Sequence, residues 1–314
     1  MAENTVKKIA TRESYGNSLK ELAEEFPNLV VLDADLAAAT KTGIFRKAYP
    51  DRHIDCGIAE SNMMGVAAGL SLVGKIPFVS SFAMFAAGRA FEQVRNSIGY
   101  PHLNVKIGAT HAGITVGEDG ATHQCNEDIA LMRTIPGMVV MCPSDDVEAR
   151  AAVRAALEYE GPVYIRFGRA AVPVINDHPG YHFEIGKGTV VREGKDVTIV
   201  ATGICVDSAL GAAKMLEEEG ISAEVVNICT IKPLDEEIII NSAKKTGKVV
   251  TVEEHSVIGG LGSAVCDCLC AHYPVPVKKV GMQDVFGESG SAAALVEKYG
   301  LDAKGVYKSV KEFL

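Results

Sequence analysis

Short apolar runs alternate with helical patterns along almost the whole chain, and this alternation limits the folds that it can adopt. In the first half the apolar runs are rich in Val and Ile and are bounded by Gly, Pro, Ser or Asp, as buried strands are. The predicted strands are 29–35, 76–81, 104–110, 137–142 and 162–167, and the predicted helices are 12–26, 61–73, 84–99, 126–134 and 146–160. Strands that are apolar on both faces, with helices between them, predict a mostly parallel sheet covered by helices on both sides.

Two of these helices begin with capping signals. Thr11 precedes the helix 12–26 and has a side chain that can accept a hydrogen bond from the first turn. Asp145 stands three residues before Glu148 at the start of the helix 146–160, which is the spacing of a capping box. We therefore expect Thr11 and Asp145 to fix the starts of their helices.

A second alternating unit follows a segment at 170–187 that contains two prolines and two glycines. Its predicted strands are 196–202, 223–228, 248–254 and 275–281, and its predicted helices are 205–219, 235–244 and 260–272. The sequence thus predicts an α/β fold with two doubly wound domains, namely 1–170 and a smaller domain at 188–314, joined by a linker at 171–187. In open α/β sheets ligands bind at the carboxyl ends of the strands, so the loops there are the first place to look for function.

Composition excludes several classes of protein. The formal net charge is −9 and no block of Lys and Arg stands out, which argues against a nucleic-acid partner. No apolar run reaches the length of about 18 residues that indicates a membrane span, and the first residues lack the apolar core of a secretory signal. The eight cysteines form no CxxC pair, so we expect small buried thiols in a reducing cytoplasm rather than a metal or redox site.

Glu60 is a single carboxylate in the small and apolar stretch GIAESNM at 57–63. A buried carboxylate without a partner costs several kcal/mol or shifts its pKa. Glu60 therefore needs a partner, and a ligand is one candidate.

The loop at 110–128 is the most unusual part of the chain, because it holds two histidines and four acidic residues directly after a predicted strand. His111 and His123 are twelve residues apart, a spacing that no common zinc motif uses. A glycine-rich structural loop is a second interpretation. Histidine and aspartate that converge on a hydroxylated or phosphorylated ligand fit the composition better, since His donates to phosphate and Asp accepts from hydroxyls.

Phe82 and Phe85 stand three residues apart where the predicted strand 76–81 leads into the helix 84–99. Such a pair is most often part of a core. Beside a pocket at the end of a strand, it can instead form the wall for a flat heteroaromatic ring.

Several of these motifs, in this order, resemble the transketolase family. The stretch DCGIAESNMMGVAAGL at 55–70, with Phe82, Phe85 and the motif ATHAGITVGEDGATHQ at 109–124, is similar to its pyrimidine-binding domain. EEHSVIGGLGSAV at 253–265 is similar to its C-terminal domain, for which we expect mainly dimer contacts. The resemblance covers essentially the whole chain, and it implies that the protein is an enzyme that uses thiamine diphosphate.

The family's N-terminal domain, with the GDG…N motif that binds the metal and the diphosphate, has no counterpart here. EDG at 118–120 is not that motif, because no suitably placed Asn follows it. The resemblance therefore implies the C-terminal subunit of a split transketolase. A separate N-terminal subunit would bind Mg²⁺ or Ca²⁺, and the chain would self-associate as a dimer within an α2β2 assembly that acts on phosphorylated sugars.

The resemblance also assigns residues to the cofactor. Glu60 corresponds to the family acid that hydrogen-bonds N1′ of the aminopyrimidine, and a buried acid of raised pKa suits that task. Phe82 and Phe85 correspond to the aromatic wall around this ring, and Asp35 to an acid near the cofactor and the subunit contact. The family often has Tyr where Gly88 stands, so one side of the pocket departs from the usual pattern.

For the substrate, the resemblance implies that Asp119 reads a donor hydroxyl. His123 and His111 contact the carbonyl, the sugar or its phosphate, and both are therefore candidate catalytic residues.

Two arginines complete the assignment. Arg12 and Arg166 correspond to the arginines that hold the acceptor phosphate, a task that suits the planar guanidinium. A family serine that helps to bind this phosphate is replaced by Ala39.

Three alternatives remain open at this point. The chain also fits the β subunit of a 2-oxoacid dehydrogenase or an enzyme like 1-deoxyxylulose-5-phosphate synthase, which have a similar layout. The third is a non-catalytic subunit on the same fold. Conversion of a ketose phosphate, decarboxylation of an oxoacid, or neither would distinguish them.

Overall fold

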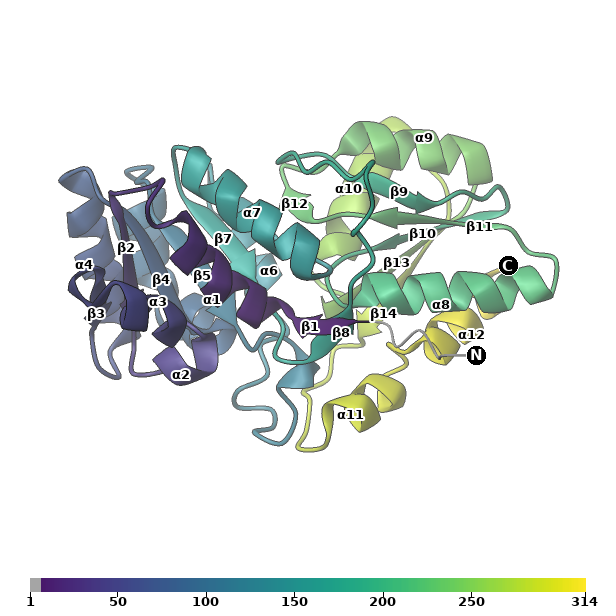
Figure 1. Ribbon diagram of the computed structural model, residues 1–314. Helices are drawn as coiled ribbons and strands as arrows, with labels where there is room; N and C mark the ends of the chain where they lie inside the picture. The colour runs from purple at the N-terminus through teal and green to yellow at the C-terminus, as the bar shows by residue number, and fades with distance from the viewer. Residues whose placement is uncertain (1–6) are drawn as a thin grey trace.

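The computed structural model describes residues 7–314 and contains two α/β units, drawn at the left and right of Figure 1. The first sheet has the strand order β12 (Thr230–Lys232), β6 (Val139–Met141), β7 (Val163–Arg166), β5 (Lys106–Thr110), β4 (Ile76–Phe82), β2 (Leu29–Asp33) and β3 (His53–Asp55). All neighbours in it are parallel except β12, which pairs antiparallel with β6. Strands β2, β5, β6 and β7 are buried along their whole length, as the apolar runs predict.

Helices cover both faces of the first sheet. Helices α1 (Thr11–Leu22), α3 (Gly43–Ala48) and α7 (Asp146–Glu158) share one apolar core, and α1 lies beside α7 (Figure 1). The opposite core includes residues of α4 (Glu60–Leu72), of α6 (Asp128–Arg133) and of two π-helices, η2 (Met84–Arg89) and η3 (Val94–Gly99). The shorter helical segments are α2 (Ala37–Thr40), η1 (Pro50–Arg52), α5 (Phe91–Gln93) and η4 (Ile114–Val116).

The second sheet has the order β14 (Val277–Met282), β13 (Val249–Ser256), β10 (Val197–Ala201), β11 (Ala223–Asn227) and β9 (Thr189–Arg192), and only β9 is antiparallel to its neighbour. Helices α8 (Cys205–Glu218) and α12 (Ala303–Phe313) cover one face, and α9 (Glu236–Thr246) and α10 (Leu261–His272) cover the other (Figure 1). Helix α11 (Ala292–Lys298) packs against η4 of the first unit. The predicted fold of two doubly wound units, each with a mostly parallel sheet, is confirmed.

The two units are joined by more than a linker. Strand β12 comes from the second unit but extends the first sheet. The segment 171–187, which the sequence predicts to be a linker, begins with β8 (Ala171–Pro173), and this strand pairs antiparallel with β1 (Lys8–Ala10). One apolar core also runs from α4 and η3 of the first unit to α9 and α10 of the second.

Some local predictions need correction. Thr11 is the first residue of α1 rather than its cap, and its hydroxyl accepts a hydrogen bond from the Gly168 N–H at 2.8 Å. The region 84–99 is not one α-helix, since η2 and η3 flank the short α5. The cap at Asp145 is confirmed, because its carboxylate accepts from the Glu148 N–H at 2.9 Å. The Glu148 carboxylate turns instead to Ser144, where it accepts from the N–H and from the hydroxyl.

Five of the eight cysteines are buried, Cys56 and Cys266 are half-buried, and Cys270 is exposed. All eight are free thiols. Within residues 7–314, no helix is both long enough and apolar enough to cross a membrane.

Candidate active site

The candidate residues gather where the parallel strands of the first sheet end. Phe82 ends β4, Thr110 ends β5 and is followed by His111, and Arg166 ends β7. Carboxyl ends of neighbouring parallel strands meet at one edge of a sheet, so side chains distant in the sequence come together there. The loop between His111 and Glu127, hereafter the 111–127 loop, crosses this edge.

Four aromatic rings form a continuous cluster at this edge. Phe82 stacks on His111 with 3.9 Å between ring centroids, and on Phe85 with 5.9 Å. His123 meets Phe85 edge to face at 5.3 Å and Phe82 at 6.4 Å. The structure therefore brings together both phenylalanines and both histidines that the sequence singles out.

His111 is held in one tautomer by its two partners. Its Nε2 lies 3.0 Å from Nη1 of Arg12, and its Nδ1 lies 2.9 Å from the Thr110 hydroxyl. Because a guanidinium can only donate, Nε2 is the accepting nitrogen and Nδ1 carries the proton. Burial, followed by the positive charges of Arg12, Arg169 and Lys41, lowers the pKa of His111 to about 3. The ring is therefore neutral at physiological pH.

Arg12 is fixed by the turn that follows β2. Its Nη1 also donates to the carbonyl oxygen of Ala39 at 2.9 Å. The turn is held by the buried Asp33, whose carboxylate accepts from the Leu36 N–H and, at 2.7 and 2.8 Å, from the hydroxyls of Thr40 and Thr42. At Ala39, where the resemblance implies a family serine, the backbone carbonyl therefore orients the arginine.

Glu60 is the first residue of α4, a position where the helix dipole favours a negative charge. The residue is 2% exposed, and its Oε2 accepts a hydrogen bond from Nη1 of Arg89 at 3.0 Å. The guanidinium of Arg89 also lies over the ring of Phe85, 4.6 Å from its centroid. The partner that a buried carboxylate requires is thus Arg89 in the chain alone.

Sequence reasoning missed Arg89 because its ion pair joins it to Glu60, which is 29 residues away, and such a contact leaves no local pattern. The Cβ that another residue would add at Gly88 would lie 2.3 Å from Cε of Met84, so Gly88 lets that side chain pass. Arg89, the next residue, reaches the ring of Phe85. An arginine therefore lies on the side of the pocket that the glycine leaves open.

A cavity of about 770 Å³ adjoins this group. Phe85 and Arg89 line it from the first unit, Gln124 from the 111–127 loop, and Asp284 and Phe286 from the second unit. Its size suits a cofactor or a drug-sized ligand, for which pockets of about 300–1,000 Å³ are usual.

Arg166 does not face this site as a free phosphate ligand. Its side chain is 5% exposed, and its Nε donates to the carboxylate of Asp128 at 2.9 Å. Its Nη2 donates to the carbonyl oxygens of Cys125 and Glu254. A guanidinium with these partners is part of the buried structure, so its geometry does not favour the phosphate role that the resemblance implies for it.

Arg169, three residues further on, is better placed than Arg166 to contact a ligand at this edge of the sheet. It is 38% exposed, and its guanidinium donates to the carbonyl oxygen of Val116 and to the carboxylate of Glu118 in the 111–127 loop. Its charge is among those that lower the pKa values of Arg12 and His111, after the larger effect of burial. The signal was available in the sequence: Arg166 lies inside the predicted strand 162–167, whereas Arg169 follows it, where ligand-binding loops begin.

The two remaining acids are exposed. Asp35 has φ of 59° in the turn after β2, and its N–H donates to the carboxylate of Asp55 at 3.0 Å. Asp119 lies in a turn of the 111–127 loop. Neither side chain is buried against the aromatic cluster, so both are free to meet a ligand or a partner chain.

Comparison with protein families gives two matches. Residues 7–174 match the transketolase pyrimidine-binding domain, and residues 186–306 match the transketolase C-terminal domain. Together the two families account for most of the chain.

Individual relatives agree with these matches. The chain is 52% identical to a putative transketolase C-terminal section of Methanocaldococcus jannaschii, over 96% of this chain and 95% of that protein. It is 49% identical to a 6-deoxy-6-sulfo-D-fructose transketolase subunit of a Clostridium species, over 96% and 93%. It is 40% identical to one subunit of an apulose-4-phosphate transketolase of Phocaeicola vulgatus, over 98% of each.

Solved structures show the same relation. A split-gene transketolase, described as an inactive β4 tetramer, superposes with a TM-score of 0.89 at 59% identity and covers 98% of each chain. A transketolase of Campylobacter jejuni gives a TM-score of 0.82 at 25% identity, and this chain covers 47% of it. The chain belongs to the transketolase family, in which it corresponds to the separate C-terminal section of the split members.

Proposed function

We propose that this chain is the C-terminal subunit of a thiamine-diphosphate-dependent transketolase that moves a two-carbon ketol unit from a ketose phosphate to an aldose phosphate. The observation that carries the proposal is the buried carboxylate of Glu60, which Arg89 links to the stacked pair Phe82 and Phe85, next to a cavity of about 770 Å³. A buried acid, two flat rings and an adjoining cavity are what an aminopyrimidine needs.

The chain fits one half of the cofactor. Among residues 7–314, no group of three or more His, Cys, Asp or Glu side chains is placed to hold a metal ion. The metal, Mg²⁺ or Ca²⁺, and the diphosphate that it binds are therefore assigned to a separate N-terminal subunit. The description of a 59% identical relative as an inactive β4 tetramer supports this division, and it also supports self-association of these chains.

Thiamine diphosphate, when bound, supplies the nucleophilic carbon and the electron sink that transfer of a ketol unit requires. Glu60 would hold a proton against the ring nitrogen N1′, and for this its carboxylate must exchange the contact with Arg89 for one with the ring. Phe82 and Phe85 would support the ring and keep water from it.

The other end of the site would bind the sugar. His123, which is half-buried at the edge of Phe85, and the exposed Asp119 are placed to contact hydroxyl or carbonyl oxygens of the substrate. His111 would accept a hydroxyl hydrogen bond through Nε2 once Arg12 moves to the phosphate. Arg12 and Arg169 are the phosphate ligands that the geometry favours, because paired guanidinium groups bind phosphate oxygens strongly.

The reaction is tested by reconstitution. The purified chain, a split-transketolase N-terminal subunit from the same source, thiamine diphosphate and Mg²⁺ are mixed with xylulose 5-phosphate and ribose 5-phosphate. We expect ketol transfer by the mixture and none by either subunit alone. Transfer by this chain alone would contradict the split site. Decarboxylation of a 2-oxoacid in place of ketol transfer would contradict the reaction.

A further inference from the structure

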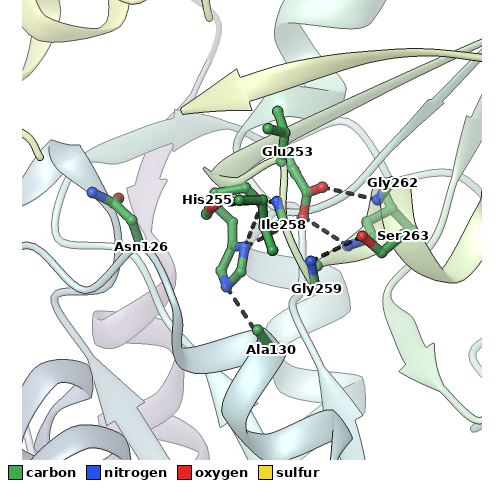
Figure 2. A network of polar contacts seen from close by, with 12 residues as sticks. Asn126, Ala130, Glu253, His255, Ile258, Gly259, Gly262 and Ser263 are labelled. Atoms are coloured by element: carbon green, nitrogen blue, oxygen red, sulfur yellow. Dashed lines mark hydrogen bonds and ion pairs between the residues drawn. The ribbon is translucent and has the colours of Figure 1, made fainter. Parts of the chain in front are cut away.

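Two adjacent carboxylates on β13 serve different neighbours. Successive side chains of a strand point to opposite faces, so Glu253 and Glu254 leave β13 in opposite directions. Glu253 accepts hydrogen bonds from the N–H groups of Leu261 and Gly262 at 2.7 and 2.8 Å and so caps the start of α10 (Figure 2). Glu254 points the other way, toward the 111–127 loop of the first unit.

Glu254 holds the first half of this loop. The residue is 3% exposed, and its Oε1 accepts from the Thr115 N–H at 2.6 Å. Gly113 makes room for the contact: its φ is 74°, and a Cβ there would lie 2.3 Å from Cδ of Glu254. Only glycine satisfies both conditions without strain, so the loop is built around this carboxylate.

Arg166 ties the end of the same loop to β13. Its guanidinium donates to the carbonyl oxygen of Cys125, in the loop, and to that of Glu254, in β13. The Glu254 carboxylate lies 3.8 Å away, and Asp128 supplies the second negative charge. Arg166, Asp128 and Glu254 are buried, and Arg166 pairs with both carboxylates, so each of these contacts is costly to break.

Further contacts join the loop to other parts of the second unit. The Gln124 side-chain amide donates to the carbonyl oxygen of Glu288 at 2.9 Å, and the Ser256 N–H donates to that of Asn126 at 2.7 Å. Just beyond the loop, Nε2 of His255 accepts from the Ala130 N–H at 3.3 Å in α6 (Figure 2). Strand β13 and the segment around Glu288 therefore hold this loop and the helix that follows it.

We infer that the second α/β unit fixes the 111–127 loop in its working conformation, and that Glu254 is the positioning residue through which it acts. The loop carries His111, Asp119 and His123, whereas Glu60 and Phe82 stand on α4 and β4 outside it. The inference rests on the proposed function, since these loop residues are the proposed substrate contacts. Loss of the contact between Glu254 and the loop should therefore weaken binding and conversion of the sugar and leave binding of the cofactor's pyrimidine intact.

The test compares Glu254→Ala with Glu254→Gln, which keeps an acceptor for the Thr115 N–H. Hydrogen exchange of the whole chain, read by mass spectrometry, should show faster exchange across 111–127 in Glu254→Ala and near wild-type exchange in Glu254→Gln. Glu253→Ala is the matched control, and it should speed exchange at the start of α10 only. Glu254→Asp, whose shorter side chain cannot reach Thr115, takes the place of Glu254→Ala if that variant does not fold.

Kinetics of the reconstituted enzyme separate positioning from general damage. In Glu254→Ala we expect kcat/KM for the ketose phosphate to fall by as much as about 100-fold, the cost of a small misplacement of reacting groups, at an unchanged Kd for thiamine diphosphate. Unchanged exchange across 111–127, or equal losses of cofactor affinity and kcat/KM, would overturn the inference. Absence of ketol transfer by the wild-type enzyme counts against the proposed function alone, because the exchange measurement does not depend on activity.

Discussion

The two ends of the candidate site treat charge in opposite ways. At the Glu60 end, a buried carboxylate has one positive partner, Arg89, whose own side chain is 52% exposed. At the Arg12 end, a buried and neutral histidine lies among positive charges. At both ends an arginine contacts the group that is proposed to meet the ligand, so each ligand must replace a contact that the chain makes with itself.

The charge at each end of the site determines which kind of ligand that end can bind. A carboxylate that can exchange its partner suits a ring nitrogen that shares a proton. A set of positive charges around a neutral ring suits a dianion, since the positive groups repel one another until a phosphate neutralises them. The charges of the chain alone therefore agree with the proposed division of the site between cofactor and sugar phosphate.

The largest expected effect concerns the Glu60 end. Glu60→Gln removes the group that holds the proton but keeps the shape, so kcat of the reconstituted enzyme should fall by about 10²–10⁴-fold. Glu24→Gln, the same change at an exposed acid in the turn after α1, is the matched control and should cost far less. Steady-state kinetics and analytical ultracentrifugation check activity and assembly together. A Glu60→Gln enzyme that keeps most of its kcat would contradict the role of Glu60.

The next largest effect concerns folding stability and distinguishes Arg166 from Arg169. Arg166→Met leaves Asp128 buried without its charge partner, a loss that typically costs about 3–5 kcal/mol of folding free energy. Arg169→Met should cost less than about 1 kcal/mol, because its ion pair with Glu118 is exposed. Urea unfolding of the isolated chain measures both. Equal stability of the two variants would mean that Arg166 is not a structural residue.

The Arg12 end is then tested through the substrate. Arg169→Met should raise KM for ribose 5-phosphate, because it removes a hydrogen bond to a charged group, which is worth about 1.5–3 kcal/mol. KM for a non-phosphorylated aldose acceptor should stay nearly unchanged. Arg150→Met, which removes a surface arginine of α7 paired with Asp146, is the control. If Arg169→Met raises KM equally for the phosphorylated and the non-phosphorylated acceptor, Arg169 does not bind the phosphate.

Much of the fold could be predicted because it follows from the length and spacing of apolar runs and from the turn residues between them. Apolar runs such as 29–35 are too short for helices and end in turn residues, so strands were the natural interpretation. Contacts between distant segments leave no such trace. Nothing in the three residues of β12 indicates that they extend the sheet of the other unit, and nothing in the sequence of β8 indicates its pairing with β1.

The gathering of the two phenylalanines and the two histidines was predictable, because they follow the ends of neighbouring parallel strands, and so was the need of the buried Glu60 for a partner. The positions of three other arginines, Arg89, Arg166 and Arg169, were not predicted, for two physical reasons. A residue's position relative to the end of a strand decides whether its side chain is buried or reaches a loop, which separates Arg166 from Arg169. The ion pair of Arg89 joins it to Glu60, which is 29 residues away, and no local pattern indicates such a contact.

The smallest expected effect is the pH dependence that the neutral His111 adds to stability. Its pKa is about 3 in the folded chain against an ordinary value of 6.5, so below pH 6.5 the unfolded chain binds a proton that the folded chain does not. Folding free energy is then lost as the pH falls from 6.5 toward 3, by about 1 kcal/mol between pH 6.5 and 5.5. His111→Gln should remove this part of the slope, while His182→Gln, at an exposed site, should retain it. Urea unfolding from pH 5.5 to 7.5 measures the slope for each variant. Identical slopes for wild type and His111→Gln would mean that the ring titrates normally, and that burial and the nearby positive charges do not hold it in the neutral form.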